Sequence, residues 1–343
     1  MRFIISRDVL ESSLNIVSKA VTNKTPIAVL TGIKFDLTEE GLNLTGSDTD
    51  LSISTFIPVE TNTSQNITVF STGSCVLNAK YITEIVKKID SDRIELELID
   101  STLVKITDQK SNFSLNSINV ADFPFIDFNF DKNVIVMKGD LLKQVISQTI
   151  FATSIKETRP ILTGVNFKID GNVLEAVATD TYRLAKKKVV LGDSAYVNVT
   201  IPNKSLSEVS KIISGNEEVT INFFDKKVLF KVGDTIVSTR VINGVYPDTT
   251  RLIPENFDYK LTTLTTDIVS AVDRASLLST DGNNIVKLSM NLDKIELSSR
   301  SQEIGSVVEK ISNYDYKGNK LDISFSAQYI QDAIKAIGSN EVE

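Results

Sequence analysis

The stretch Leu30-Thr31-Gly32-Ile33-Lys34-Phe35 occurs a second time in the chain, as Leu162-Thr163-Gly164-Val165-Asn166-Phe167. The block Ser47-Asp48-Thr49 also occurs again, as Thr179-Asp180-Thr181, and the offset between its two copies is the same. No insertion or deletion separates the two matching blocks. A match that keeps one offset over this distance indicates that the chain is built from repeated domains.

A second block occurs three times and makes the repeat threefold. It covers residues 79–86, 203–209 and 327–334, and successive copies are equally spaced along the chain. Phe123-Pro124 also matches Tyr246-Pro247, and each proline follows a strand-like stretch. We therefore expect three domains, at 1–128, 129–255 and 256–343. The third domain stops before the strands that follow this block in the other two, so we expect it to lack its last strands.

The order of hydrophobic periods predicts an α+β fold for each domain. In the first domain, apolar residues at helical spacing predict one helix behind Asp8, as its N-cap, running to about Ala20, and a second helix over 82–89. Alternating or apolar stretches predict strands at 2–6, 29–37, 42–45, 51–58, 93–99, 102–107 and 112–118. Two short helices packed on antiparallel sheets, repeated three times, are the expected architecture.

The composition excludes several classes of function. Of the 343 residues, 37 are Lys or Arg and 44 are Asp or Glu, which gives a net charge of −7. Any affinity for nucleic acid must then come from basic residues gathered on one face. Histidine is absent and Cys75 is the only cysteine, which excludes Ser-His-Asp and Cys-His catalysis, the usual zinc sites and an intrachain disulfide. We expect no catalytic residue, no metal and no cofactor.

No targeting or membrane segment is expected. The apolar run near the N-terminus, Phe3-Ile4-Ile5, is far shorter than the apolar region of a secretory signal. No later stretch approaches the ~18 apolar residues that a membrane span needs. A single cysteine suits a reducing compartment, so we expect a cytoplasmic protein.

Several motifs, together with the threefold repeat, carry a resemblance to a known family. They are Leu44-Thr45-Gly46-Ser47-Asp48, Arg159-Pro160-Ile161-Leu162-Thr163-Gly164, Ala178-Thr179-Asp180-Thr181-Tyr182-Arg183-Leu184, and Tyr246-Pro247-Asp248 leading to Arg251-Leu252-Ile253-Pro254. Over its whole length the sequence resembles the bacterial β sliding clamps, the processivity factors of the replicative DNA polymerase. In that family three similar domains per chain join head to tail in a homodimer, a ring of six domains with helices inside and sheets outside.

The resemblance implies a DNA sliding clamp that is not an enzyme. Such a ring encircles duplex DNA without reading its sequence and tethers the replicative polymerase subunit; the clamp loader and other proteins with clamp-binding motifs are further partners. The geometry is reasonable, because repeats joined by a heterologous contact form a ring when the contact closes. Two alternatives stay open: a clamp-like peptide-binding scaffold that does not encircle DNA, and a carboxylate-dependent hydrolase on a repeat scaffold.

The family also implies a peptide-binding groove between the second and third domains. The matching positions here are Leu162, Thr179, Thr181, Tyr182, Arg183, Leu184, Pro247, Arg251 and Leu252. The apolar members would receive apolar side chains of a short linear motif, and the two arginines would offer hydrogen-bond donors. Thr181 and Tyr182 stand where the family often has glycine and histidine, so one wall of the groove is expected to differ in shape. The alternative for Leu162 and Leu184 is ordinary core.

Two further sets of residues are candidates for the inner face and for ring closure. The residues expected to face DNA are Lys24, Lys80, Lys156, Arg159 and Lys204, and those expected at the dimer contact are Phe113, Leu115, Leu277 and Leu278. Lysine and arginine would meet phosphates rather than base edges, which allows sliding. The alternatives are an ordinary solvated surface for the basic residues and internal core for the apolar ones.

The acidic stretch Asp48-Thr49-Asp50 begins like a calcium-binding loop. Its sixth position is Ile53, where such a loop needs glycine, and its twelfth is Val59, where it needs glutamate. We therefore expect a turn here and no metal site.

Overall fold

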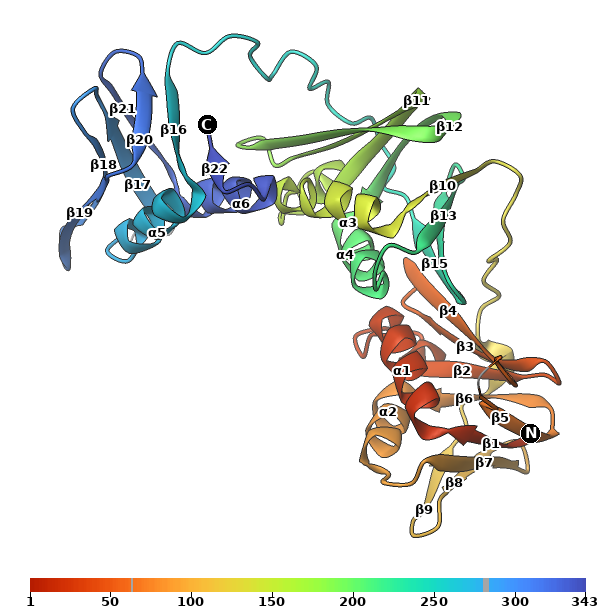
Figure 1. Ribbon diagram of the computed structural model, residues 1–343. Coiled ribbons are helices and arrows are strands. Elements are labelled where there is room, and N and C mark those ends of the chain that lie inside the picture. Colours follow the sequence, from red (N-terminus) through yellow and green to blue (C-terminus); the bar gives the residue numbers. More distant parts are fainter. Residues whose placement is uncertain (63, 280–283) are drawn as a thin grey trace. The chain divides into compact units, whose positions relative to one another are not determined.

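The computed structural model describes residues 1–62, 64–279 and 284–343. Its helices and strands are numbered in chain order, and Figure 1 labels them where there is room. The chain divides into two compact units. The first contains Met1–Ile146, Asn166–Glu175 and Lys188–Asn243, and the second contains Ser147–Val165, Ala176–Lys187 and Gly244–Glu343.

The first repeat contains two helices and a set of strands, as predicted. They are β1 (Arg2–Ser6), α1 (Arg7–Val17), β2 (Gly32–Leu37), β3 (Gly41–Ser47), β4 (Leu51–Pro58), β5 (Ile67–Ser71), β6 (Gly73–Asn78), α2 (Ala79–Lys88), β7 (Arg93–Ile99), β8 (Leu103–Thr107) and β9 (Asn112–Asn116). The predicted strands at 2–6, 51–58 and 93–99 are confirmed with the same bounds.

Three local predictions need correction. The N-cap of α1 is Ser6 rather than Asp8, because β1 runs directly into the helix and the Asp8 carboxylate instead pairs with Arg7 at 2.8 Å. The predicted strand at 29–37 begins only at Gly32, since Ala28–Thr31 forms a short 3-10 helix that buries Val29 and Leu30. The strands β5 and β6 are absent from the sequence prediction.

The helices of the first repeat bury one face each. Leu10, Leu14 and Val17 of α1 are fully buried, as are Ile82 and Val86 of α2. The two helices contact each other, and α1 also contacts β3 and β4. A fully buried side chain of this size stabilises the fold by about 1.5–3 kcal/mol relative to exposure, so the two apolar stripes fix the helices on the sheet.

The second repeat has the same pair of helices. Its elements are β10 (Val134–Lys138), α3 (Gly139–Ser147), β11 (Gly164–Thr179), β12 (Leu184–Pro202), α4 (Asn203–Ile212), β13 (Glu218–Phe223), β14 (Lys227–Val232) and β15 (Thr235–Arg240). In the alignment of the two repeats, the first and last residues of β11 correspond to the start of β2 and the end of β3.

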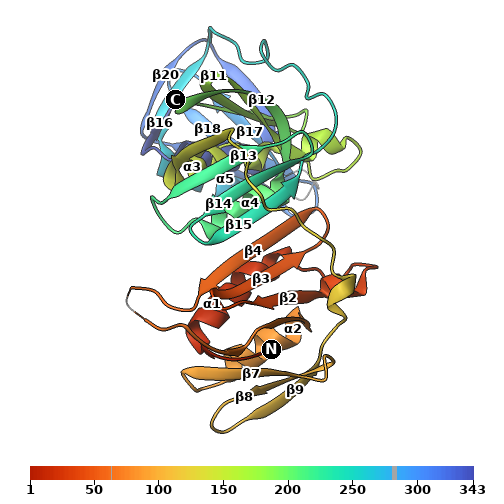
Figure 2. The ribbon, with the colours of Figure 1, turned by 90° about the vertical axis from the view of Figure 1, so that its right-hand side faces the viewer.

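One sheet contains strands of both the first and the second repeat. Its order is β10-β13-β14-β15-β4-β3-β2-β6, and a second sheet of the same compact unit has the order β5-β1-β7-β8-β9. In the larger sheet β15 pairs antiparallel with β4, from Thr235 opposite Thr55 to Thr239 opposite Leu51 (Figure 2). The hydroxyl oxygens of Thr55 and Thr235 lie 3.0 Å apart. The backbone ladder therefore continues from one repeat into the next.

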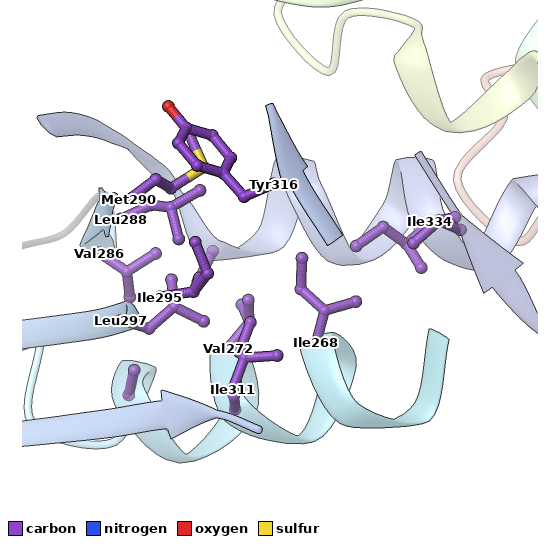
Figure 3. Packing of buried hydrophobic residues seen from close by; sticks show 14 residues of the cluster. Ile268, Val272, Val286, Leu288, Met290, Ile295, Leu297, Ile311, Tyr316 and Ile334 are labelled. Carbon is purple, nitrogen blue, oxygen red and sulfur yellow. The ribbon is translucent and has the colours of Figure 1, made fainter. Parts of the chain in front are cut away.

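The third repeat lies in the second compact unit. Its elements are β16 (Lys260–Leu264), α5 (Thr265–Ser276), β17 (Ile285–Met290), β18 (Ile295–Ser301), β19 (Gly305–Ile311), β20 (Tyr314–Lys317), β21 (Leu321–Ser326), α6 (Ala327–Ile337) and β22 (Glu341–Val342). These strands form one sheet in the order β20-β16-β22 and another in the order β19-β18-β17-β21. Ile268 and Val272 of α5 and Ile334 of α6 belong to the same buried cluster as strand residues such as Ile295 and Leu297 (Figure 3).

Candidate functional site

The turn between β11 and β12 is held by its own side chains. The Asp180 Oδ1 atom accepts hydrogen bonds from the backbone N–H groups of Tyr182 at 2.9 Å and Arg183 at 3.0 Å. The Thr179 hydroxyl accepts from the Thr181 N–H at 3.1 Å and donates to the Arg183 carbonyl at 2.7 Å. Thr181 itself has a φ of +80°. This network leaves the Tyr182 side chain 83% exposed.

Arg183 connects this turn to the second helix of the third repeat. Its Nε lies 3.1 Å from Asp180 Oδ2 and its Nη1 lies 2.6 Å from Asp332 Oδ2 on α6. The guanidinium also lies over the Tyr329 ring, 4.3 Å from its centroid. Burial, followed by the charge of Asp180, raises the pKa of Tyr329. Arg183 is thus bound within the chain, whereas the resemblance implies a donor to a bound peptide.

The segment that follows β15 is anchored to the same turn by Tyr246. The Tyr246 hydroxyl oxygen accepts a hydrogen bond from the Thr179 N–H at 3.0 Å. Burial raises the pKa of Tyr246 to about 12. Beyond it, Asp248 Oδ1 accepts from the Thr250 N–H at 2.9 Å, and the Leu252 N–H donates to the Thr249 carbonyl at 3.2 Å. These turns leave Leu252 63% exposed.

The remaining groove candidates differ in exposure. Leu162, in the short 3-10 helix Pro160–Thr163, is only 2% exposed and belongs to the core. Thr179 is also buried, while Leu184 is partly buried at the start of β12. The exposed members are Thr181, Tyr182, Pro247, Arg251 and Leu252. All of the candidates lie in the second compact unit, where Tyr182 and Leu252 supply the largest exposed apolar side chains among them.

Sequence reasoning missed Asp332 and Tyr329 as partners of this turn. Both lie on α6, whose block 327–334 the repeat identifies as a helix. For Tyr246 the sequence did offer a signal. The repeat aligns Tyr246 with Phe123, so the second repeat has a hydroxyl group where the first has none.

The residues expected to face DNA are exposed. Lys24 and Lys156 lie in loops of the same local geometry, because the Lys24 N–H bonds the Thr22 hydroxyl at 3.2 Å and the Lys156 N–H bonds the Ser154 hydroxyl at 3.1 Å. Lys80 and Arg159 are also exposed. Lys204, on α4, is exposed but its Nζ lies 2.6 Å from Asp48 Oδ2. That carboxylate offsets part of the positive charge of Lys204.

The residues expected at the dimer contact occupy an edge strand and a helix end. Phe113 and Leu115 lie on β9, which is at the edge of its sheet, and Phe113 is exposed whereas Leu115 is partly buried. Leu277 and Leu278 directly follow α5, and Leu277 is exposed whereas Leu278 is partly buried. An edge strand offers unpaired backbone groups to a second chain.

The expected turn at Asp48 is confirmed. Asp48 Oδ1 accepts from the N–H groups of Asp50 at 3.1 Å and Leu51 at 2.8 Å. Within 1–62, 64–279 and 284–343, the structure contains no group of three or more His, Cys, Asp or Glu side chains arranged to hold a metal ion. The thiol of Cys75 is buried, and burial raises its pKa to about 12. None of the helices in the described part of the chain has the length and apolar character of a membrane span.

Comparison with known proteins defines the class. Three family models match consecutive parts of the chain: the N-terminal domain of the DNA polymerase III beta subunit at residues 1–127, its central domain at 136–248 and its C-terminal domain at 250–343. A chain with all three is a DNA polymerase III beta subunit, which is a non-enzymatic processivity factor of DNA replication.

Full-length relatives carry the same assignment. The chain is 43% identical to the beta sliding clamp of Bacillus subtilis over 348 residues and 42% identical to that of Staphylococcus aureus over 346 residues, covering 100% of this chain and 92% of each relative. This chain belongs to the beta sliding clamp family.

Solved structures agree with this assignment. The crystal structure of the sliding clamp from Bacillus subtilis matches with a TM-score of 0.94 and 42% identity, over 99% of this chain and 91% of that one. The beta chain from Streptococcus pneumoniae matches with a TM-score of 0.95 and 33% identity, over the same shares of the two chains. The predicted fold class, three clamp-type α+β domains, is confirmed.

Proposed function

We propose that two copies of this chain close head to tail into a ring around duplex DNA in the cytoplasm, and that the ring tethers the replicative polymerase. The observation that carries the proposal is the match of all three beta-subunit domains, in order, along one chain. The net charge of −7 also favours retention by topology over adhesion to phosphates. The clamp loader and other proteins with clamp-binding motifs are the further partners of such a ring.

Retention on DNA of different topology tests the ring. The protein, loaded onto closed circular duplex, is expected to stay bound through gel filtration and to be released after the DNA is linearised. A scaffold that does not encircle DNA would leave circular and linear DNA at equal rates. That result would reject the ring and favour the alternative of a peptide-binding scaffold.

Ring closure is proposed to use Phe113 and Leu115 on β9 of one copy and Leu277 and Leu278 of the other. Phe113→Asp or Leu277→Asp is expected to shift the protein from dimer to monomer in sedimentation, because a buried charge at an apolar contact is costly. Phe70→Asp is the matched control, since Phe70 is also exposed but lies on β5, at the opposite edge of the same sheet. Equal dissociation in the control would remove β9 from the dimer contact.

Lys24 and Lys156 are proposed to contact phosphates at the inner face, with Lys80, Arg159 and Lys204. Their support is exposure and the matching loop geometry at repeat-equivalent positions. Lys24→Glu with Lys156→Glu is expected to shorten residence on DNA, more at low salt than at high salt, with little change in unfolding. Lys110→Glu with Lys168→Glu changes the charge equally at two other exposed lysines and is the control. An unchanged response to DNA at low salt would make the two lysines plain surface.

The groove for linear motifs is proposed at Tyr182, Leu184, Pro247, Arg251 and Leu252, next to the turn that Thr179 and Thr181 form. Its support is the exposed apolar surface of Tyr182 and Leu252 beside an anchored loop. A short peptide with one polar anchor and two spaced apolar residues should bind with micromolar affinity, because ordering the peptide opposes binding. The buried Leu162 would support this surface from beneath.

Two variants and one control test this groove by calorimetry. Leu184→Ala and Arg251→Ala are each expected to weaken peptide binding roughly tenfold, about 1.4 kcal/mol. Ser52→Ala is the control, because Ser52 is the repeat equivalent of Leu184 in the first domain. If both variants bind the peptide like the parent, the groove lies elsewhere.

A further inference from the structure

A cavity of about 620 Å³ lies in the first compact unit, whereas the groove candidates all belong to the second unit. Three segments line it: the turn before β4, the linker that leaves the first repeat, and the ends of β14 and β15. The charged and aromatic residues of its lining that matter for binding are Asp50, Phe125, Asp127, Lys226, Lys227 and Arg240.

The cavity occupies the repeat-equivalent position of the candidate groove. Its lining residues Thr49 and Ser52 align with Thr181 and Leu184 of the second repeat, and Pro124 aligns with Pro247. The first repeat therefore uses its turn and its exit linker at this cavity, as the second repeat does at the candidate groove. The facing side chains differ, since Ser52 stands where the second repeat has an apolar leucine.

Basic side chains outnumber acidic ones around the cavity. Lys227 Nζ donates to the backbone carbonyl of Asp127 at 2.6 Å and to Asp127 Oδ2 at 2.9 Å. These two bonds hold the linker that leaves the first repeat against the start of β14. The Lys227 hydrogen bond lowers the pKa of Asp127. Arg240 lies 3.8 Å from Asp50, and both side chains are exposed, so this pair is weak. Lys226 is exposed and forms no ion pair with any described residue.

The positive charges gather at one end of the β14–β15 ladder. Lys227 and Arg240 are cross-strand partners, and the Val241 N–H donates to the Lys226 carbonyl at 3.2 Å. Beside them Phe125, on the exit linker, is 89% exposed. A cationic end next to an unburied aromatic ring is complementary to a carboxylate followed by an apolar side chain.

We propose that this cavity binds an extended acidic peptide segment of a partner protein, with a carboxylate at Lys226 and Arg240 and an apolar side chain on Phe125. A nucleic acid fits less well, because three cations against two carboxylates are too few for a chain that carries a charge at every nucleotide, whereas one peptide carboxylate needs only Lys226 and Arg240. The site is distinct from the candidate groove and does not depend on it.

Fluorescence anisotropy with the full chain tests the site. The probe is a labelled peptide Glu-Leu-Glu-Phe-Glu-Leu, and Lys-Leu-Lys-Phe-Lys-Leu is the charge control. We expect only the acidic peptide to bind. Lys226→Glu and Phe125→Ser should each weaken binding roughly tenfold, whereas Lys110→Glu, at an exposed lysine outside the cavity, should leave it unchanged.

A double variant separates this site from the candidate groove. In Leu184→Ala with Arg251→Ala, binding of the acidic peptide should equal that of the parent, whether or not the candidate groove binds its own peptide. The proposal is overturned if this double variant loses the acidic peptide or if the basic peptide binds equally well. Unchanged binding in Lys226→Glu and Phe125→Ser, or equal displacement of the peptide by a short oligonucleotide, overturns it too.

Discussion

The turns Ser47–Leu51 and Thr179–Arg183 occupy the same place in two repeats, and their backbones are held in the same way. In each, an aspartate Oδ1 accepts two backbone N–H groups, and the hydroxyl of the preceding residue accepts a third. The central threonine has a φ of +82° in the first turn and +80° in the second. The backbone of the turn is therefore a property of the repeat.

The side chains that leave the two turns differ. Asp48 pairs with Lys204 of the second repeat, while Asp180 pairs with Arg183, which in turn binds Asp332 of the third. Asp50 in the first turn corresponds to Tyr182 in the second. The same turn thus carries an aspartate in the first repeat and a tyrosine in the second.

The largest expected difference between the two turns is the stability that is lost when the cation paired with each turn is removed. Arg183→Ala leaves the largely buried carboxylates of Asp180 and Asp332 without their cation and removes the stacking on Tyr329, so we expect the second compact unit to lose about 2–3 kcal/mol. Lys204→Ala removes an exposed cation and should cost under about 1 kcal/mol. Hydrogen exchange, read separately for each compact unit, measures both losses. Equal losses of stability in the two variants would show that the buried and the exposed ion pair contribute the same.

The backbone hydrogen bonds that the turn aspartates accept should matter equally in both repeats. Asp48→Ala and Asp180→Ala each remove the acceptor of two backbone N–H groups, and we expect this loss to cost about 1–2 kcal/mol in each turn. Asp180→Ala should cost more in total, because it also takes one carboxylate partner from the largely buried Arg183. Asparagine keeps an oxygen at this position, so Asp48→Asn should recover more than half of its loss and Asp180→Asn a smaller part, since the ion pair with Arg183 is not restored. Denaturant unfolding provides the values. If asparagine is as harmful as alanine, charge rather than hydrogen bonding holds the turns.

Tyr246→Phe makes the second repeat resemble the first, where Phe123 stands at the matching position. Loss of the acceptor for the Thr179 N–H should cost about 1 kcal/mol at neutral pH. The folded-state pKa of Tyr246 is raised by burial to about 12, above the ~10 of an unfolded chain. As the pH rises, the unfolded chain loses this proton first, which lowers the free energy of unfolding. The contribution of Tyr246 to stability is therefore complete below about pH 10 and is lost as the pH rises to about 12.

The measurement is the difference in unfolding free energy between the parent and Tyr246→Phe across this pH window. The difference is required because the pKa of Cys75 is also raised to about 12, and its contribution cancels. We expect the gap between parent and variant to narrow above about pH 10. A gap that stays constant would show that the tyrosine titrates as it does in water.

The smallest expected effect concerns the two threonines with positive φ. A β-branched residue in the left-handed region is strained by about 1–2 kcal/mol, and glycine relieves this at an entropic cost of about 0.5–1 kcal/mol. Thr49→Gly and Thr181→Gly should therefore each stabilise their unit by roughly 0.5 kcal/mol in thermal unfolding. Thr107→Gly, on β8 between its partners β7 and β9, should destabilise instead. The same sign at all three sites would argue against strain.

Sequence patterns predicted the helices well because each repeats an apolar stripe at the same place. The sequence predicted a strand from residue 29, whereas Ala28–Thr31 forms a 3-10 helix. Val29 and Leu30 pack with Val76 in a small cluster of their own, and a short apolar run has no period that separates the two conformations. The strands β5 and β6 were not predicted because each has only a short apolar stretch, Ile67 to Phe70 in β5 and Cys75 to Leu77 in β6, and such a stretch has no period that identifies a strand.

For the candidate groove, the backbone of the turn could be predicted from the sequence, whereas the side-chain contacts of the turn could not. The repeat aligned Thr49 with Thr181 and identified the turn, and the resemblance identified Arg183 and Leu184 as residues of interest. The partner of Arg183 on α6 lies 149 residues away, and no local pattern pairs one arginine with one of 44 acidic residues. Burial of Leu162 likewise depends on tertiary packing.

The ladder that joins β4 to β15 also constrains how the chain is made. Thr55 on β4 is synthesised before its partner Thr235 on β15, which lies 180 residues later in the sequence. At about 5–20 residues per second, roughly 10–40 seconds of synthesis separate the two strands. During this time β4 is an open sheet edge, the kind of surface that promotes aggregation. Ser52, Ser54 and Thr55 place hydroxyl groups along it, so this open edge is less apolar than a strand of aliphatic residues would be.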